Sequence, residues 1–403
     1  MHHQALLIAG FAAFAIATPA PQNIDFAAIN AAAPVAMTGP APNATQEAVT
    51  INPASASVEG AAKATAVAVA AATAAQKAKR GWGWGGSTAT TSCTTSVPSA
   101  VPTHVEAAPA TTPPPAAPPA ATPAERVPCA IQPDGYGPKV QPDTTDAFLA
   151  YAEFHSEAKG ALTPSSYTQT FVDLNAAVSA NSYLGLTTFK SYDVAKCGAL
   201  CDNTDLCTGF NIYVERDPSV DPSDTCSNPA SITNYKCTLW GSGVDSASAT
   251  NSGQWRDSFQ VVITGSNGYE KEPAPATQPG WKAPQQCGGG TKAHSHPSTS
   301  LGQSFFPGPY NPALCASYAA AQNKKNAGHV SSLMKMVFRT DAYSPYQCKF
   351  FNAYMLEKNG KPMGTYCSLF AQSYGSDQAT YEPGQQGSDT WTCSRSYGYD
   401  IAS

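Results

Sequence analysis

Charged side chains are scarce in this sequence, at 13 % of 403 residues, and the formal net charge is −5. Because positive charge is not in excess, nothing favours nucleic acid or an anionic membrane surface as a partner. The twelve cysteines include no Cys-x-x-Cys pair, the spacing typical of structural zinc sites. A Gly-x-Ser-x-Gly motif and a Gly-rich phosphate loop are also missing. The sequence therefore gives no sign of a catalytic centre, a zinc site or a bound cofactor.

Long apolar runs are absent as well, so no membrane span is predicted. The run from Leu6 to Ile16 is too short to cross a bilayer. Its end overlaps Ala15-Ile16-Ala17, a small-x-small cleavage site, and residues 1–20 are therefore predicted to be a secretory signal. A signal and an even number of cysteines together predict disulfide bonds and a secreted, extracellular or cell-wall-associated protein.

Residues 21–80 are rich in alanine and poor in large side chains. The run from Val58 to Ala78 has good helix propensity but no face worth burying, so a disordered pro-segment is predicted here. It ends in Lys79-Arg80, a dibasic pair that a kexin-like secretory protease would cut. The alternative is that this pair is a solvated charge patch without a role.

Residues 81–128 begin with a Gly/Trp patch and continue as a Pro/Thr-rich tract. Proline removes hydrogen-bond donors and holds the backbone extended, which predicts a stalk. Cys93 lies inside it, so its partner must come from elsewhere in the chain or from another molecule.

Residues 129–168 are predicted to be a helical lead-in to the folded part. Asp143 is expected to cap a helix from Thr144 to about Ala158. His155 on this helix is expected to be packed or solvated rather than a ligand, since no partner for it stands nearby in the sequence.

The main feature of the sequence is a segment that occurs twice. The copies open with Leu184-Gly185 and Leu301-Gly302. Matching landmarks follow in the same order, namely Phe189 and Phe306, Cys197 and Cys315, Cys207 and Cys348, Cys237 and Cys367, and Tyr269 and Tyr399. A duplicated module is therefore predicted at 169–270 and 287–403, joined by a proline-rich linker at 271–286.

Each copy is expected to combine one short helix with several strands, which makes the fold class α+β. Asp193 is expected to cap the first helix, which runs to about Asp202, and Asn311 to cap the second. The predicted strands of the first module are Thr170–Leu174, Cys207–Glu215, Cys237–Trp240 and Phe259–Ile263, with a loop at Arg216–Pro229. Those of the second are Cys348–Leu356, Tyr366–Phe370 and Thr390–Ser394, with a turn at Glu357–Gly360.

This pattern resembles the PAN/apple module. The residues that carry the resemblance are two cysteines four apart on a helix, a third that opens an aromatic strand, and a Cys-x-Leu-Trp strand: Cys197, Cys201, Cys207 and Cys237-Thr238-Leu239-Trp240. In the second copy Ala319 stands where the second helical cysteine would be. The whole chain is similar to secreted fungal proteins of the fruiting-body type, which have tandem modules and no assigned activity. The family fold, an antiparallel sheet cradling one helix, implies binding and not catalysis.

The resemblance also implies three disulfide bonds, Cys197–Cys237, Cys201–Cys207 and, through the repeat, Cys315–Cys367. Each would contribute about 2–4 kcal/mol by restricting the unfolded chain. Six cysteines remain, and the sequence does not decide how they pair: Cys93, Cys129, Cys226, Cys287, Cys348 and Cys393.

Aromatic side chains are the candidates for ligand binding, because sugars stack on flat rings. Trp240 and Phe370 match in the repeat and are expected in the core, whereas Trp255 and Trp391 are equally compatible with core and surface. Arg256 would add a polar group beside Trp255. For metals, Asp217, Asp221 and Asp224 or His294 and His296 could be considered, but their spacing is not that of a dedicated site and no metal site is predicted.

These observations predict a non-catalytic binding or matrix component that recognises cell-wall polysaccharide or an extracellular glycoprotein. A secreted hydrolase of wall polysaccharide is the alternative from another class. It would need two carboxylates across a cleft, one with a raised pKa, and nothing marks out such a pair. The third possibility is a structural wall protein crosslinked through Cys93.

Overall fold

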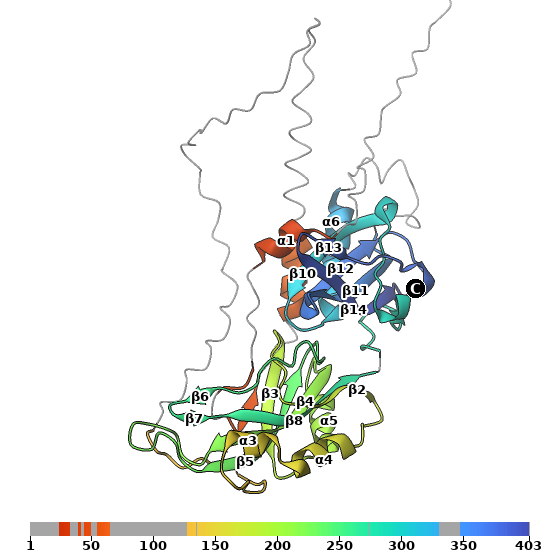
Figure 1. Cartoon of the computed structure of the whole chain (residues 1–403). Helices are drawn as coiled ribbons and strands as arrows, with labels where there is room; N and C mark the ends of the chain where they lie inside the picture. The colour runs from red at the N-terminus through yellow and green to blue at the C-terminus, as the bar shows by residue number, and fades with distance from the viewer. Residues whose placement is uncertain are drawn as a thin grey trace, which may run out of the picture.

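The computed structural model describes residues 24–32, 39–41, 44–49, 55–64, 127–133, 135–272, 274–329 and 347–402. The predicted signal, Lys79-Arg80 and Cys93 lie outside the described residues. Within these ranges the chain is α+β, with two six-stranded antiparallel sheets, one two-stranded sheet, few helices and four disulfide bonds (Figure 1).

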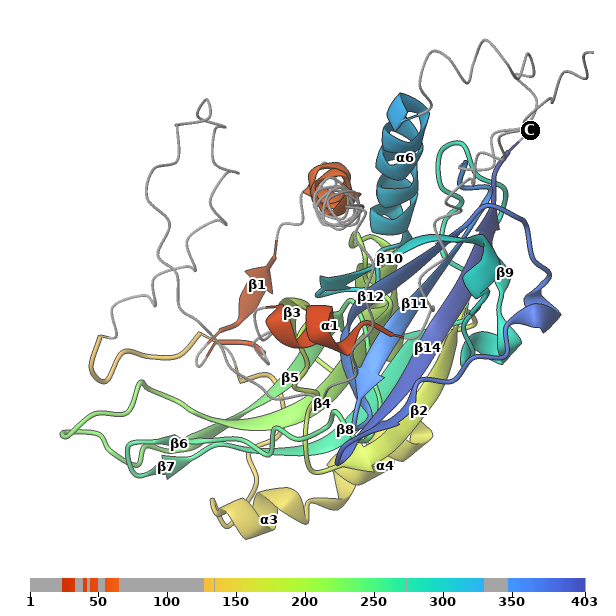
Figure 2. The same ribbon diagram turned by 90° about the horizontal axis from the view of Figure 1, so that it is seen from above.

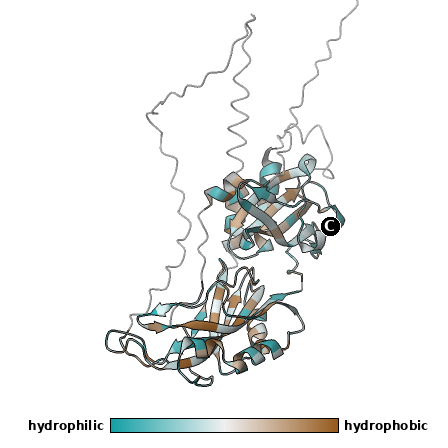
Figure 3. Cartoon of the chain, in the orientation of Figure 1, coloured by the Kyte–Doolittle hydropathy of each residue, from teal (hydrophilic) through white to brown (hydrophobic). Residues whose placement is uncertain are grey.

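The first sheet comes from residues 167–271 and one strand of the N-terminal region. Its strands are β1 (Gln46–Ala48), β2 (Tyr167–Leu174), β3 (Tyr183–Phe189), β4 (Gly209–Pro218), β5 (Ser231–Trp240) and β8 (Val262–Lys271). They pair antiparallel in the order β1-β3-β5-β4-β8-β2. Phe210, Ile212 and Val214 alternate along β4 and pack into one core with the helices that cover this face. Apolar residues gather on the strands of both sheets (Figure 3).

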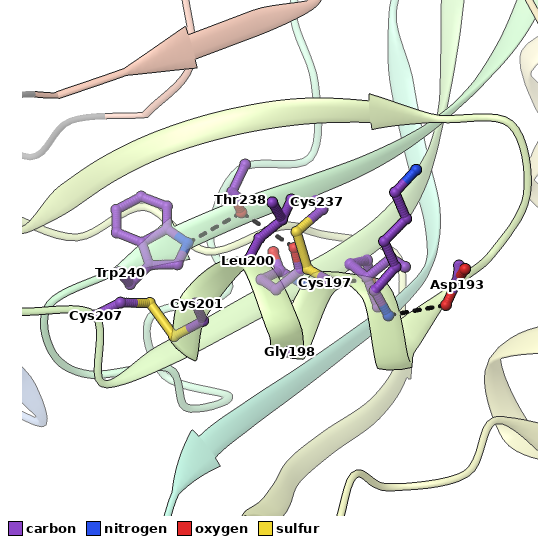
Figure 4. The surroundings of a disulfide bond; sticks show 12 residues. Asp193, Cys197, Gly198, Leu200, Cys201, Cys207, Cys237, Thr238 and Trp240 are labelled. Atoms are coloured by element: carbon purple, nitrogen blue, oxygen red, sulfur yellow. Dashed lines mark hydrogen bonds between the residues drawn. A yellow bond between two sulfur atoms is a disulfide. The ribbon is translucent and has the colours of Figure 1, made fainter. Parts of the chain in front are cut away.

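Helix α5 (Val194–Asp202) lies on the first sheet and is fixed to it by sulfur (Figure 4). Asp193 caps it by accepting a hydrogen bond from the Lys196 N–H at 2.9 Å, which confirms the predicted cap. The two implied bonds are present: Cys197–Cys237 joins the helix to β5, and Cys201–Cys207 joins it to the entry of β4.

The second sheet repeats this arrangement. Its strands are β9 (Gln285–Gln286), β10 (Ser300–Pro307), β11 (Phe350–Lys358), β12 (Lys361–Phe370), β13 (Gly384–Gln386) and β14 (Asp389–Asp400), in the order β10-β12-β11-β14-β13 with β9 also on β14. Short 3₁₀ helices are η1 (Gly288–Gly290), η2 (Pro297–Thr299) and η3 (Ser376–Gln378). Helix α6 (Pro312–His329) covers one face, and Cys315–Cys367 joins it to β12 as the repeat implies. The predicted turn between β11 and β12 is confirmed, since Asn359 and Gly360 both have positive φ.

A buried asparagine occupies the same place in both sheets and makes the same set of hydrogen bonds in each module. Asn211 on β4 donates to Ser266 Oγ and Asn267 O, both at 2.9 Å, and accepts from the Val178 N–H at 2.8 Å. Asn352 on β11 donates to Ser396 Oγ and Tyr397 O, both at 3.0 Å, and accepts from the His294 N–H at 2.9 Å. In each copy the asparagine side chain therefore joins its own strand to the neighbouring strand and to a segment outside the sheet, which contains Val178 in module 1 and His294 in module 2.

The helical lead-in differs from the prediction. It forms two helices, α3 (Thr145–Leu149) and α4 (Ala152–Gly160), rather than one. Thr144, and not Asp143, caps the first, accepting from the Ala147 N–H at 3.2 Å. Asp143 instead accepts hydrogen bonds from Arg216 and Ser231. A carboxylate can cap a helix or pair with an arginine, and here Asp143 pairs with Arg216, which is distant in the sequence.

A fourth disulfide, Cys129–Cys226, ties the start of the lead-in to the loop after β4. Among the cysteines that the structure describes, Cys287, Cys348 and Cys393 are buried thiols, and burial raises the pKa of each to about 12. Cys348 matches Cys207 in the repeat, and its partner position is held by the buried Ala319. Module 2 therefore keeps one of the two helix bonds of module 1.

The N-terminal region contradicts the prediction that it is disordered. Residues 24–64 contain α1 (Phe26–Ala31), β1 and a third, helical stretch at 55–64, which lies beside α6 in Figure 2. We refer to these described residues as the N-terminal cover. The expectation that the run from Val58 to Ala78 has no face worth burying was wrong for its described part, residues 58–64. There Gly60 and Ala64 form a buried stripe with Ala56, each one helical turn from the next. Small side chains give little apolar area, but they allow close contact between backbones.

The two modules touch each other directly. The Tyr310 N–H donates to Gly241 O at 3.1 Å, Asn181 Nδ2 donates to Met363 O at 3.0 Å, and Arg395 Nη1 donates to Lys271 O at 3.2 Å. In all three the acceptor is a backbone carbonyl, and in two of them the donor is a side chain, Asn181 or Arg395.

Across the part of the chain that the structure describes, no helix combines the length and the apolar character needed to cross a membrane.

Candidate binding surface

Trp255 is the most exposed aromatic side chain on the outer surface of module 1. It begins a short hairpin made of β6 (Trp255–Arg256) and β7 (Phe259–Gln260), in which the two strands pair antiparallel. The Trp255 side chain is 66 % exposed, whereas its neighbour Arg256 is 4 % exposed. Successive strand residues point to opposite sides, so burying Arg256 turns the indole ring outward.

The inward side of the hairpin is held by charges and a ring. Arg256 Nη2 lies 3.3 Å from Asp217 Oδ1. The guanidinium of Arg216 lies 4.2 Å from the centre of the Phe259 ring and donates to Gln260 O at 2.8 Å. These anchors fix the backbone beneath Trp255, so that binding a ligand would require little further ordering.

A cluster of four charged residues underlies this hairpin on the outer face of the first sheet. Lys236 Nζ lies 2.5 Å from Glu215 Oε1 and 3.1 Å from Asp217 Oδ2, and Arg256 contacts the other oxygen of Asp217. Asn234 Nδ2 also donates to Asp217 at 2.9 Å. The members are buried and their formal charges cancel. A small cavity of about 10 Å³ adjoins the cluster and is lined partly by Ala44 and Thr45 of the N-terminal cover.

The cluster separates the pKa values of its two acids. Burial, reinforced by the negative charge of Asp217, raises the pKa of Glu215 to about 7. Burial also acts to raise the pKa of Asp217, but the positive charges of Lys236 and Arg256 outweigh it and hold that pKa below its usual value. Burial would lower the pKa of Lys236, yet the two carboxylates keep it raised. Pairs of acids with divided pKa values occur at acid–base sites, but also in buried ion networks.

The sequence did not reveal this cluster. The prediction that Arg216–Pro229 is a loop was wrong at its start, because β4 continues through Pro218. Asp217 therefore lies in the sheet, apart from the turn-like calcium cluster considered from the sequence. No group of three or more His, Cys, Asp or Glu side chains is placed to hold a metal ion among the described residues.

His294 and His296 of module 2 contact each other and an aromatic ring. His294 Nδ1 lies 3.0 Å from His296 Nε2, and the His296 ring stacks on Tyr374 with ring centres 3.6 Å apart. Burial, with a contribution from His296, lowers the pKa of His294 to about 4. A neutral, ring-packed histidine pair is part of the module's packing.

His155 has a partner that the sequence did not reveal. Its Nδ1 lies 2.6 Å from Asp173 Oδ1 and its Nε2 lies 2.8 Å from Leu149 O. Lys159 Nζ also lies 2.8 Å from Asp173 Oδ2. The histidine ties the lead-in helices to β2, and an open, shallow depression lies beside it along α4.

The remaining aromatic candidates divide between core and cover. Trp240 and Phe370 are fully buried, as expected. Trp391 is 3 % exposed, and the ring of Phe26 from the N-terminal cover meets it edge-on at 5.1 Å. The Trp391 Nε1 has no hydrogen-bond partner among the described residues. Of the three predicted binding residues, Trp255 is therefore accessible, while Arg256 and Trp391 are enclosed.

The described part of module 2 has no counterpart of the exposed indole. Gly253-Gln254-Trp255 precedes the last long strand of module 1, and Gly384-Gln385-Gln386 holds the corresponding place before β14. The duplicated modules thus differ where module 1 presents its ring. Comparisons with known proteins give no match to any family model, curated protein or solved structure.

Proposed function

We propose that this protein is a secreted, non-catalytic binding protein with two PAN/apple-like modules, and that it attaches to cell-wall polysaccharide through Trp255. The repeated sheet, helix and disulfide pattern supports the modular part of the proposal. The disulfides are compatible with an oxidising, extracellular environment.

The observation that carries the ligand assignment is the exposed Trp255 ring on an anchored hairpin. A single exposed apolar side chain is ordinary on a protein surface. Here, however, Arg256 and Phe259 hold the backbone on either side of the turn, so the ring is presented on a fixed support. A tryptophan has two side-chain torsions and a large flat face, and it loses little conformational entropy on binding.

The test is retention of the purified protein on insoluble glucan, chitin and mannan. We expect Trp255→Ala to reduce retention at least about tenfold on the polysaccharide that the native protein binds, because the stacking surface is lost. Trp255→Phe should keep part of the retention. Leu162→Ala is the matched control, since Leu162 is 87 % exposed and lies away from the hairpin. Full retention of Trp255→Ala, or failure of the native protein to bind any of the three, would contradict this assignment.

A polysaccharide hydrolase is the second candidate, favoured by the divided pKa values of Glu215 and Asp217. A general acid with a pKa near 7 beside an ionised carboxylate is the arrangement that glycoside hydrolysis uses. Lys236 lies against both carboxylates, and the adjoining cavity is far smaller than a sugar ring. This candidate predicts the release of reducing sugar by the native protein and its loss in Glu215→Gln. Hydrolytic activity that survives Glu215→Gln would exclude Glu215 and Asp217 as the catalytic acids.

A further inference from the structure

The N-terminal cover adds a strand to the edge of the first sheet. Strand β1 pairs antiparallel with β3, with Glu47 opposite Leu186. The Thr188 N–H donates to Thr45 O at 2.9 Å, and the Val49 N–H donates to Leu184 O at 3.0 Å. Without β1, strand β3 would be the edge of the sheet and its outward N–H and C=O groups would lack partners.

The β3 edge is shaped for such a strand. Tyr183 Oη donates to Glu47 Oε2 at 2.6 Å, which places an acidic side chain at a defined position along β3. Gly185 has φ +149°, and a Cβ built on it would lie 2.5 Å from Glu47 O. A glycine is therefore required where the added strand approaches most closely.

The same cover holds module 2 at two more points. Phe26 lies on Trp391, Ile24 and Ile29 are buried beside it, and the Asp25 N–H donates to Tyr366 Oη at 3.0 Å. At the other point, Gly60 lies so close to α6 that a Cβ on it would stand 2.7 Å from Ser317 Cβ and 2.8 Å from the Tyr318 N. Along the sequence the cover thus contacts module 2, then module 1, then module 2 again (Figure 2).

The contact around Trp391 buries large side chains, whereas the other two contacts are small. The strand has three residues, and the helix at 55–64 contributes alanines and a glycine. Residues 65–126, which contain Lys79-Arg80, connect the cover to the modules along the chain. After one cut at this pair, the cover is no longer covalently joined to the modules and the described contacts hold it in place. Removing it would uncover three surfaces: the β3 edge, the Trp391 ring and the seat on α6.

We propose that residues 24–64 are a detachable cover, and that the β3 edge beneath it is an interaction surface for an extended peptide. The peptide pairs antiparallel with β3 and carries an acidic side chain that faces Tyr183. The cover's own β1 is the template for this partner. Main-chain hydrogen bonds to β3 would give the affinity, and the Tyr183 hydroxyl and the close approach at Gly185 would give the specificity. This surface is separate from the sugar contact proposed for Trp255.

The first experiment compares the full chain before and after cleavage at Lys79-Arg80 with a dibasic-specific protease. A chain in which another protease site replaces this pair supplies the same cut if the native pair is resistant. We expect the N-terminal fragment to separate on gel filtration after cleavage. Hydrogen exchange at the Thr188 amide should then accelerate at least about tenfold, while β4 and β5 stay protected. A fragment that remains bound through dilution, or an unchanged Thr188 amide, would overturn the detachable cover.

The second experiment uses a synthetic peptide of residues 39–64 as the probe. It should bind the separated protein, restore protection at Thr188 and fail to bind the uncut chain. A peptide with Glu47→Lys should bind at least about tenfold more weakly, because its ammonium group cannot accept the Tyr183 hydrogen bond. Equal binding of both peptides, or equal binding to cut and uncut protein, would refute the strand-accepting edge. Retention on polysaccharide is not part of either readout, so this outcome is independent of the sugar-binding test.

A substitution in the helix tests the contact itself. Gly60→Ala raises helix propensity but places a methyl group against Ser317 and Tyr318, so we expect the cut fragment to dissociate about tenfold faster. Val58→Ala is the matched control: Val58 is exposed on the same helix, and the change should leave dissociation equal or slower. Slower dissociation of the Gly60→Ala fragment would mean that this helix face does not touch α6, and would refute the contact between the helix at 55–64 and α6.

Discussion

Replacing Lys236 by methionine is the sharpest test of the charge cluster in module 1. Lys236 Nζ lies against both Glu215 and Asp217, and the variant leaves one positive charge, on Arg256, for two buried carboxylates. Removing one partner of a buried ion network costs about 3–5 kcal/mol, because the remaining charge stays uncompensated. We expect a loss of this size in the free energy of unfolding of module 1 at pH 8.

The loss should depend on pH in a defined direction. The pKa of Glu215 in the folded protein is about 7, above its ordinary value of 4.5. Its stabilising contribution is therefore complete below about pH 4.5 and is lost as the pH rises through 7. Without Lys236 this pKa rises further. At pH 5 Glu215 is protonated in both proteins, whereas at pH 8 the native protein pairs its carboxylate with Lys236 and the variant has lost that partner. The difference in unfolding free energy between native and variant should be smaller at pH 5 than at pH 8.

The assay is urea unfolding at both pH values with the disulfides intact, followed by hydrogen exchange of peptides from β4 and β5. These peptides report on module 1 separately from module 2. The double variant Glu215→Gln with Lys236→Met is the control, because it restores a formal charge of zero and keeps the Asp217–Arg256 pair. It should recover most of the lost stability. A cost below about 1 kcal/mol at pH 8, or equal costs at both pH values, would refute the reasoning.

Two further predictions test the repeat. Asn211→Ala and Asn352→Ala should each destabilise their own module by about 2–4 kcal/mol, because buried backbone groups lose their partners, and hydrogen exchange should show no loss in the other module. Ala319→Cys should form a disulfide with Cys348 and stabilise module 2 by about 2–4 kcal/mol, since the pair then matches Cys201–Cys207. Mass spectrometry after alkylation checks the bond, and free thiols at both positions would contradict the match.

Much of the modular part of the fold could be predicted from local signals. The cap at Asp193, the Asn359-Gly360 turn and the alternation along Phe210, Ile212 and Val214 all act within a few residues, and the structure contains each of them. The strands of the second module were predicted by matching its sequence to the strands predicted in the first module. The differences are larger elsewhere: β3 and β10 were not predicted, the predicted strand Phe259–Ile263 divides between β7 and β8, and β4 runs on to Pro218.

The candidate surface could not be predicted in the same way. In the sequence Glu215 ends a predicted strand and Arg216 and Asp217 begin a predicted loop. The pairing of the two acids depends on Lys236 and Arg256, which come from other strands. Trp255 and Trp391 are the same residue type in similar surroundings, and a ring from the distant N-terminus decides that the second is covered. Such partners are set by tertiary contacts and leave no mark on local composition.

The N-terminal cover was missed for a different reason. Apolar periodicity detects helices that bury large side chains, whereas Ala56, Gly60 and Ala64 allow a close approach of two helices. The sequence does show these residues at four-residue spacing. The signal was a stripe of small residues within a segment of high alanine content, where the background hides it.

The small side chains at residues 55–64 of the cover also matter while the chain is being synthesised. Residues 24–64 are made before both modules, and Trp391 is among the last residues of the chain. At ordinary rates of translation the wait between Ala64 and Trp391 is roughly 15–65 s. Strand β1 can pair with β3 as soon as module 1 is made, but residues 55–64 must wait for α6, and a stretch rich in large apolar groups would aggregate in that time. The glycine and alanines of residues 55–64 keep this stretch soluble until α6 exists to receive it.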